Sequence, residues 1–294
     1  MRILGPSAVA AVIALASTSA YAHGFAGARF FPATILIEDP FVADELALPT
    51  YTHRKGGEEP GVTEDEFEAE FSKRITSNFA LSIEGGWSHE SDGADHAEGW
   101  GNIEIGAKYQ VLKIDEDEFV LSVGLEAELG GTGSEHLEVE GFNTYTPAIY
   151  FGKGLGTLPA SMDLLRPIAV TGFGGVGIPD ENDEASHLVY GLAIEYSLPY
   201  LHANVRDIGL PEWLNQVTPL VEMSFSTPLD HGDGEPTTGT INPGLIWSGK
   251  SIQIAAEAVI PINRESGDTV GFMAQLHFYL DDIFPDSVGT PVFK

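Results

Sequence analysis

The sequence predicts an all-β protein, an antiparallel up-and-down transmembrane β-barrel of about 12 strands. Three observations lead to this prediction. Apolar and polar residues alternate with a period of two through most of the chain, as in 102–111, and helical periodicity is almost absent. Beyond the first residues, the chain has no run of about 18 apolar residues that could cross a bilayer as a helix. The connections alternate between short turns and long polar loops, which is typical of outer-membrane barrels.

The first 22 residues are expected to be a secretory signal peptide. Met1 and Arg2 give a positively charged start, the run 8–20 is apolar, and Ala20-Tyr21-Ala22 matches a cleavage site. An uncleaved membrane anchor is the alternative. The predicted division of the chain is a signal peptide at 1–22, a plug or periplasmic extension at 23–44, the barrel at 45–281 and a C-terminal tail at 282–294.

The expected strands are mostly about ten residues long or slightly longer, the length that a tilted strand needs to cross a bilayer. Eleven show clear alternation. Because bacterial barrels have an even number of strands, we expect one more over 45–53. The strands are expected at 45–53, 65–75, 78–89, 100–112, 118–130, 144–153, 167–177, 187–198, 216–227, 239–248, 251–262 and 270–281. Two connections, 154–167 and 199–215, are long although they fall on the short-turn rim.

Each strand is expected to turn one face to lipid and the other to the barrel interior. The outward face is apolar on nearly every strand, as at Phe119, Leu121 and Val123. Aromatic residues near strand ends, such as Trp87 and Tyr196, suit the two membrane interfaces. The alternative is a soluble sandwich of two sheets. That fold would bury many glutamates with few cations, at several kcal/mol for each unpaired charge.

The inward face is predicted to be a wet, acidic lumen. Its expected lining residues are Glu68, Glu70, Arg74, Glu84, Glu104, Lys108, Glu126, Glu128, Glu195, Glu222, Glu257 and His277. We expect Arg74 and Lys108 to pair with neighbouring inward glutamates. The remaining carboxylates would favour cations in a pore and repel anions. A solvated polar lining without a selected substrate is the alternative.

Composition argues against several classes of function. The chain has 44 Asp and Glu against 14 Lys and Arg, a net charge of −30, so nucleic-acid binding is not expected. The absence of cysteine excludes disulfides and thiolate metal sites. The glycine-rich stretch 172–177 lacks the G-K-[ST] of a phosphate loop, and a G-x-S-x-G elbow is absent. We therefore expect neither an enzyme nor a cofactor.

Several histidines fall in the predicted outer loops or at strand ends beside them. Imidazole and carboxylate groups are ordinary metal ligands, which makes His89, His96 and His136 the candidate metal ligands. No fixed spacing such as H-E-x-x-H accompanies them. The alternative is that they are solvated loop residues.

Several segments resemble the outer-membrane barrel family associated with the meta-cleavage pathway of phenol degradation. They are 72–87 and 99–112, which contain Gly101-Asn102 and Lys108-Tyr109, together with 218–228 and 242–262. The resemblance covers roughly residues 44 to 281. It implies an outer-membrane β-barrel and suggests uptake or transit of small molecules, including apolar or aromatic ones. Such barrels usually end in an aromatic residue that marks them for assembly, whereas here Phe293 precedes Lys294.

The leading expectation is a channel or transporter in the outer membrane of a Gram-negative cell. Its partners would be outer-membrane lipid, a small-molecule or cation permeant and, during biogenesis, the barrel-assembly machinery. The alternative is a non-conducting surface barrel that captures divalent metal or is structural.

Overall fold

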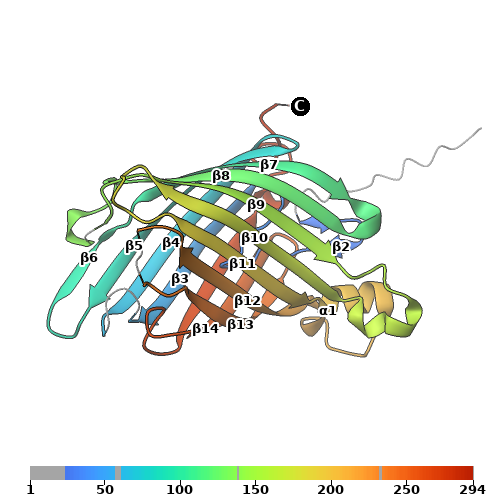
Figure 1. Cartoon of the computed structure of the whole chain (residues 1–294). Coiled ribbons are helices and arrows are strands. Elements are labelled where there is room, and N and C mark those ends of the chain that lie inside the picture. Colours follow the sequence, from blue (N-terminus) through green and yellow to red (C-terminus); the bar gives the residue numbers. More distant parts are fainter. Residues whose placement is uncertain (1–23, 57–60, 138, 232–233, 294) are drawn as a thin grey trace, which may run out of the picture.

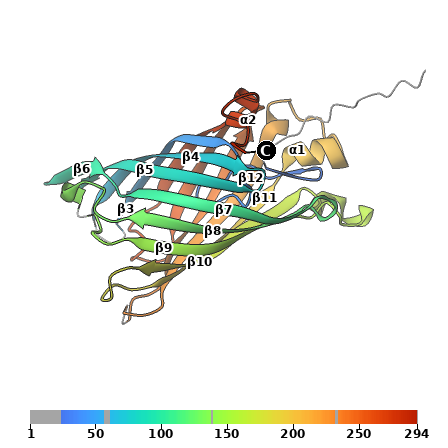
Figure 2. The same ribbon diagram turned by 90° about the horizontal axis from the view of Figure 1, so that it is seen from above.

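The computed structural model describes residues 24–56, 61–137, 139–231 and 234–293, which form a closed antiparallel β-barrel (Figures 1 and 2). Within these residues the strands of the barrel are arranged around it in chain order. The first barrel strand, β3 (Glu45–Lys55), also pairs with the last, β15 (Gly271–Tyr279), so the described sheet closes on itself. Closure removes the unpaired edges of an open sheet. The predicted signal peptide lies outside the described residues.

Twelve strands make up the described barrel, because β6 (His96–Trp100) and β7 (Ile103–Ile114) follow one another along β5 (Phe79–Ser91). The others are β4 (Thr63–Thr76), β8 (Phe119–Leu129), β9 (Thr144–Gly154), β10 (Ile168–Pro179), β11 (His187–Tyr196), β12 (Val217–Pro228), β13 (Thr238–Ser248) and β14 (Ile252–Pro261). The predicted fold class is confirmed. Each predicted strand, including the one inferred from the even count, lies within a few residues of an observed one.

Two strand ends differ from the sequence prediction. An outer loop is predicted after His89, but β5 continues to Ser91 and pairs with β6 in a hairpin that extends the wall (Figure 1). The sequence did not predict this hairpin, because polar residues on both of its faces interrupt the alternation of apolar and polar residues. The last strand ends at Tyr279, and Leu280, which falls within the predicted strand 270–281, is buried in the short helix α2 (Leu280–Ile283). Asp281 and Asp282 favour the first turn of a helix.

The two long connections at the short-turn rim fold into short helical elements at one end of the barrel (Figure 1). The first connection contains η3 (Ala160–Leu165). The second contains α1 (Leu198–Tyr200), η4 (Leu201–Val205) and η5 (Leu214–Gln216). Among the described residues, no helix is both long and apolar enough to cross a membrane.

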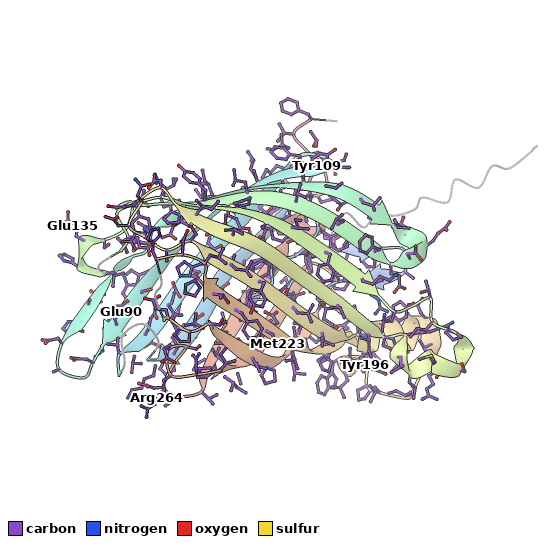
Figure 3. The ribbon with its side chains drawn as sticks, in the orientation of Figure 1. Glu90, Tyr109, Glu135, Tyr196, Met223 and Arg264 are labelled. Carbon is purple, nitrogen blue, oxygen red and sulfur yellow. The ribbon has the colours of Figure 1, made fainter. Side chains whose placement is uncertain are left out.

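The outer surface of the barrel is apolar and the inner surface is largely polar. Large apolar side chains such as Ile105 and Leu245 are exposed on the outside. In Figure 3, Glu90, Glu135 and Arg264 lie at the loop end of the barrel. An apolar surface of this extent fits the hydrocarbon of a bilayer, so the barrel is membrane-embedded.

Residues 24–44, which we call the internal segment, run from the short-turn rim into the barrel (Figure 1). The segment begins with a hairpin of β1 (Phe25–Ala26) and β2 (Arg29–Phe30). Its Phe31 and Phe41 pack with inward Val120 and Ala169 in a buried apolar cluster. The barrel core is therefore built partly from residues that precede the first wall strand.

Candidate functional site

An acidic wall lines one side of the lumen. We define it as the inward glutamates of β4, β5, β7 and β8 other than Glu64 and Glu90 at the outer rim. They are Glu66, Glu68, Glu70, Glu84, Glu104, Glu126 and Glu128. Because side chains alternate along a strand, every second residue of these segments faces inward. All seven side chains are half-buried, so solvent-sized space adjoins each of them.

Strand register aligns four of these carboxylates in a row across four neighbouring strands. Glu70 pairs with Glu84, Glu84 with Glu104, and Glu104 with Glu128. Like charges directly opposite one another on neighbouring strands are destabilising. Water, protons or cations must offset this repulsion. The row is therefore suited to attracting cations.

The opposite side of the lumen also carries carboxylates, but they are buried. Glu195, Glu222 and Glu257 are 1%, 0% and 4% exposed. Glu222 accepts hydrogen bonds from three consecutive backbone N–H groups of the internal segment, those of Ile35 (2.9 Å), Leu36 (2.6 Å) and Ile37 (3.2 Å). On this side the carboxylate holds protein backbone, so its chemistry differs from that of the acidic wall.

Side chains from opposite walls hold the middle of the internal segment. Lys108 Nζ on β7 donates to the Asp39 carbonyl at 2.6 Å and forms an ion pair with the Glu38 carboxylate. Gln253 Nε2 on β14 donates to the Ala33 carbonyl at 2.6 Å. Ser122 on β8 donates to the Pro40 carbonyl. Because these contacts come from both sides of the barrel, the segment lies across the lumen.

A buried socket anchors the start of the internal segment. Arg29, which is 0% exposed, places its Nε 3.1 Å from Glu118 Oε2 and donates from Nη1 to the Pro167 carbonyl at 2.9 Å. Its guanidinium carbon lies 3.7 Å from the centre of the Tyr200 ring, and the Tyr200 hydroxyl donates to Glu118 Oε1 at 2.7 Å. Arg29 Nη2 also donates to the Arg166 carbonyl. We call Glu118, Arg166, Pro167 and Tyr200 the Arg29 socket. Burial, together with the hydrogen bond to Glu118, raises the pKa of Tyr200 to about 12.

A second buried ion pair anchors the other end of the segment. Asp44 accepts hydrogen bonds from Arg74 Nε at 2.7 Å and Lys73 Nζ at 2.5 Å. Arg74 Nη2 donates to the carbonyl of Gly289 at 2.9 Å. The predicted C-terminal tail therefore packs against the end of β4, where the Phe293 N–H also donates to the Ile75 carbonyl at 2.8 Å.

The predicted lining residues lie on the inward face, divided between the two sides. Those on the acidic wall, together with Lys108, are half-buried, whereas Arg74, Glu195, Glu222, Glu257 and His277 are buried. His277 Nε2 lies 3.3 Å from Glu45 Oε2.

The expected pairing of the two inward cations with wall glutamates is wrong. Arg74 pairs with Asp44, and Lys108 with Glu38, because the internal segment brings its own carboxylates to them. Sequence reasoning also missed Arg29 and its socket. The available signal was that Arg29 is the sole Lys or Arg in 23–44, where a lone buried cation would need a partner.

The candidate metal ligands do not come together in one site. The rings of His89 and His96 have centroids 6.1 Å apart on paired strands, whereas His136 lies in η2 (Glu135–Leu137) of another loop. In the described part of the chain, no group of three or more His, Cys, Asp or Glu side chains is arranged to hold a metal ion.

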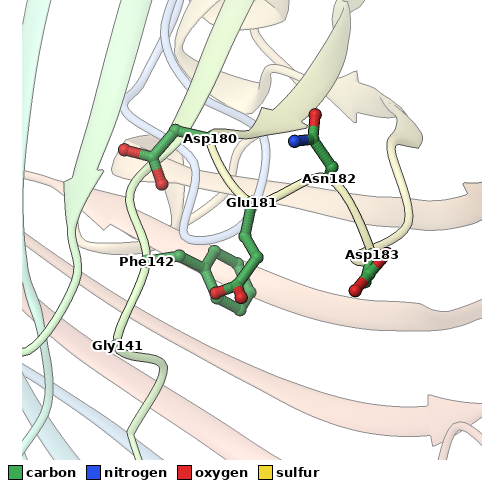
Figure 4. A pocket seen from close by; sticks show the side chains of 6 residues that line it. All are labelled: Gly141, Phe142, Asp180, Glu181, Asn182 and Asp183. Atoms are coloured by element: carbon green, nitrogen blue, oxygen red, sulfur yellow. The ribbon is translucent and has the colours of Figure 1, made fainter.

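An acidic cavity of about 480 Å³ lies between two outer loops (Figure 4). Its lining residues are Gly141, Phe142, Asp180, Glu181, Asn182 and Asp183. Asp180 joins the two loops, because its carboxylate accepts from the Asn143 backbone N–H at 2.9 Å and from Asn143 Nδ2 at 2.7 Å. The carboxylates of Glu181 and Asp183 extend the negative charge to the outer end of the barrel.

No protein-family model matches the chain, and no curated protein matches its sequence. Among solved structures, the KdgM porin is similar, with 15% identity and a TM-score of 0.48 over 79% of this chain and 98% of that one. The NanC porin has 9% identity and a TM-score of 0.47 over 79% of this chain and 98% of that one. LpxR from Salmonella typhimurium has 11% identity and a TM-score of 0.46 over 80% and 99%. Likeness at this level carries no functional argument for this chain.

Proposed function

We propose that this protein is an outer-membrane channel that passes small molecules, with a preference for cations, along an acidic lumen. The observation that carries the proposal is the row Glu70, Glu84, Glu104 and Glu128, whose carboxylates face the lumen from adjacent strands. Carboxylate rings in a pore attract cations and repel anions. The apolar outer face and the short-turn rim support insertion in the outer membrane.

The sequence resemblance to barrels associated with phenol degradation supports small-molecule transit, including that of apolar or aromatic compounds. The half-buried carboxylates favour permeants that carry positive charge or hydrogen-bond donors. The internal segment narrows the route, so the permeant must be small. Outer-membrane lipid and the barrel-assembly machinery are the partners that such a barrel requires.

The test is the reversal potential of the purified, refolded protein in a planar bilayer under a KCl gradient. We expect a cation preference that falls severalfold in the Glu84→Gln/Glu104→Gln variant, because these substitutions neutralise the centre of the row. The matched control is Glu181→Gln/Asp183→Asn, which removes the same charge from the outer loops and should change the preference less. Anion preference, absence of current or equal effects of the two double variants would contradict the proposal.

A further inference from the structure

The internal segment fills the lumen unevenly. Inward residues are buried from the short-turn rim to the middle of β12, β13 and β14. Thr218 (1% exposed), Ile246 (0%) and Gln253 (0%) lie near the rim, and Glu222 (0%), Asn242 (0%) and Glu257 (4%) lie at the middle. Inward residues at the middle of β4, β5 and β7, such as Ser72, Ser82 and Lys108, are half-buried. Side chains alternate between the two faces on all these strands. The difference in exposure between the two sides of the lumen therefore arises from the position of the internal segment. The space that remains in the lumen therefore lies beside the acidic wall.

A small cavity lies between the internal segment and strands β4, β5 and β7. Its volume is about 20 Å³, enough for a water molecule. Its lining residues are Glu38, Phe41, Glu70, Ser72, Ala80, Leu81, Ser82 and Lys108. The two carboxylates, two hydroxyls and one ammonium group provide the polar partners that water or a small ion needs. This cavity therefore offers a polar contact point between the internal segment and the acidic wall.

Lys108 is the positive charge at this point. Its ammonium group pairs with Glu38 and lies 4.8 Å from the centre of the Tyr150 ring. The Lys108 side chain is 15% exposed and that of Glu38 33%, so both adjoin the remaining space. A fixed ammonium group in a narrow, poorly screened passage repels an approaching cation.

We propose that permeant cations travel between the internal segment and the acidic wall, and that Lys108 is the residue that limits cation selectivity along this route. The inference rests on the proposed channel function and specifies its path. Glu38 partly neutralises Lys108, which allows passage while the ammonium group restrains the flux.

The proposed route is tested first by the rate of thiol modification, a measurement that does not depend on ion current. The chain has no cysteine, so a Ser82→Cys variant and a Thr218→Cys variant each present a single thiol, on opposite sides of the lumen. The reagent is 2-aminoethyl methanethiosulfonate, a small cation that reacts with thiols. In the folded full-length barrel, we expect it to modify the Ser82→Cys thiol at least tenfold faster than the Thr218→Cys thiol. Equal rates, or faster modification of the Thr218→Cys thiol, would overturn the route.

The role of Lys108 is tested by measuring the cation-to-anion permeability ratio of a variant that lacks its charge. Lys108→Gln should raise the cation-to-anion permeability ratio severalfold, whereas Lys55→Gln at the outer rim removes the same charge and should leave the ratio nearly unchanged. An unchanged or lower ratio in Lys108→Gln would overturn its assigned role.

The two experiments together separate the proposed route from the proposed function. If the Ser82→Cys thiol is modified quickly but the barrel carries no current, the channel function is rejected and the proposed route is kept. Current combined with equal modification rates would reject the route and leave the function standing.

Discussion

Arg29 and Asp44 are charged residues without exposed surface, and each is compensated by several polar partners. Removing one partner of a buried ion pair is costly, because the remaining charge stays buried and loses its compensation. Exposed pairs behave differently, since water already solvates both groups. The two ends of the internal segment should therefore contribute far more to stability than the ion pairs of the outer rim.

We expect Arg29→Ala to lower the free energy of unfolding by about 3–5 kcal/mol, because Glu118 would stay buried beside an empty socket. The matched control is Arg54→Ala. Its Nε lies 2.5 Å from Glu64 Oε2, but its side chain is 53% exposed, so the loss should stay below about 1 kcal/mol. Urea unfolding in detergent micelles, followed by tryptophan fluorescence, measures both. Similar losses would mean that the socket is not a major anchor.

Tyr200 should make the free energy of unfolding depend on pH in the alkaline range. Its pKa is raised from 10.0 to about 12 by burial and by the hydrogen bond to Glu118. The folded state therefore keeps a proton that the unfolded state loses, so this contribution is fully present below pH 10 and is lost as pH rises through about 12. Unfolding free energies measured between pH 9 and 12 should fall more steeply for the native protein than for Tyr200→Phe. Parallel curves would rule out this assignment.

At the scale of elements, the long connections 155–167 and 197–216 build the Arg29 socket together with the turn before β8. Pro167 and Arg166 supply carbonyl acceptors from the first connection, and Tyr200 supplies its ring and hydroxyl from the second. These connections therefore hold the internal segment at the rim. This role explains why two turns at the short-turn rim are long.

Shortening one of these connections should release the start of the internal segment. In a variant with residues 157–165 replaced by a short Gly-Ser turn, we expect trypsin to cut after Arg29, which is fully buried in the native barrel. Replacing the outer loop 181–185 with the same Gly-Ser turn should leave this bond protected. Mass spectrometry of the fragments distinguishes the two results. Protection of Arg29 in both variants would show that the first connection is dispensable.

Alternation predicted the strands and their faces because a barrel strand between lipid and a wet lumen must present opposite chemistry on successive residues. Glu84 and Glu104 could be placed on the inner face for this reason. The partners of Arg74 and Lys108 could not be predicted in the same way. Asp44 and Glu38 belong to a segment with little regular structure, so no period in its sequence indicates which wall it contacts. The Arg29 socket likewise joins residues distant in sequence.

At the scale of the whole molecule, the sequence carries a net charge of −30. Carboxyl groups occupy the outer cavity, the acidic wall and the buried side of the lumen. Charges in a wet lumen act on ions over a distance set by the Debye length, about 10 Å at 0.1 M salt and about 3 Å at 1 M. Bulk salt should therefore control the field that a permeating ion meets.

We expect the cation-to-anion permeability ratio to fall as KCl rises from about 0.1 M to about 1 M, because screening shortens the reach of the carboxylate row across the lumen. Reversal potentials at a constant concentration ratio and increasing mean concentration measure this dependence. Glu84→Gln/Glu104→Gln should show a flatter dependence, since less fixed charge remains to be screened. A ratio that does not change with salt in the native barrel would mean that selectivity arises from close contacts at Lys108 and Glu38. The field of the acidic wall would then have little influence on which ions pass.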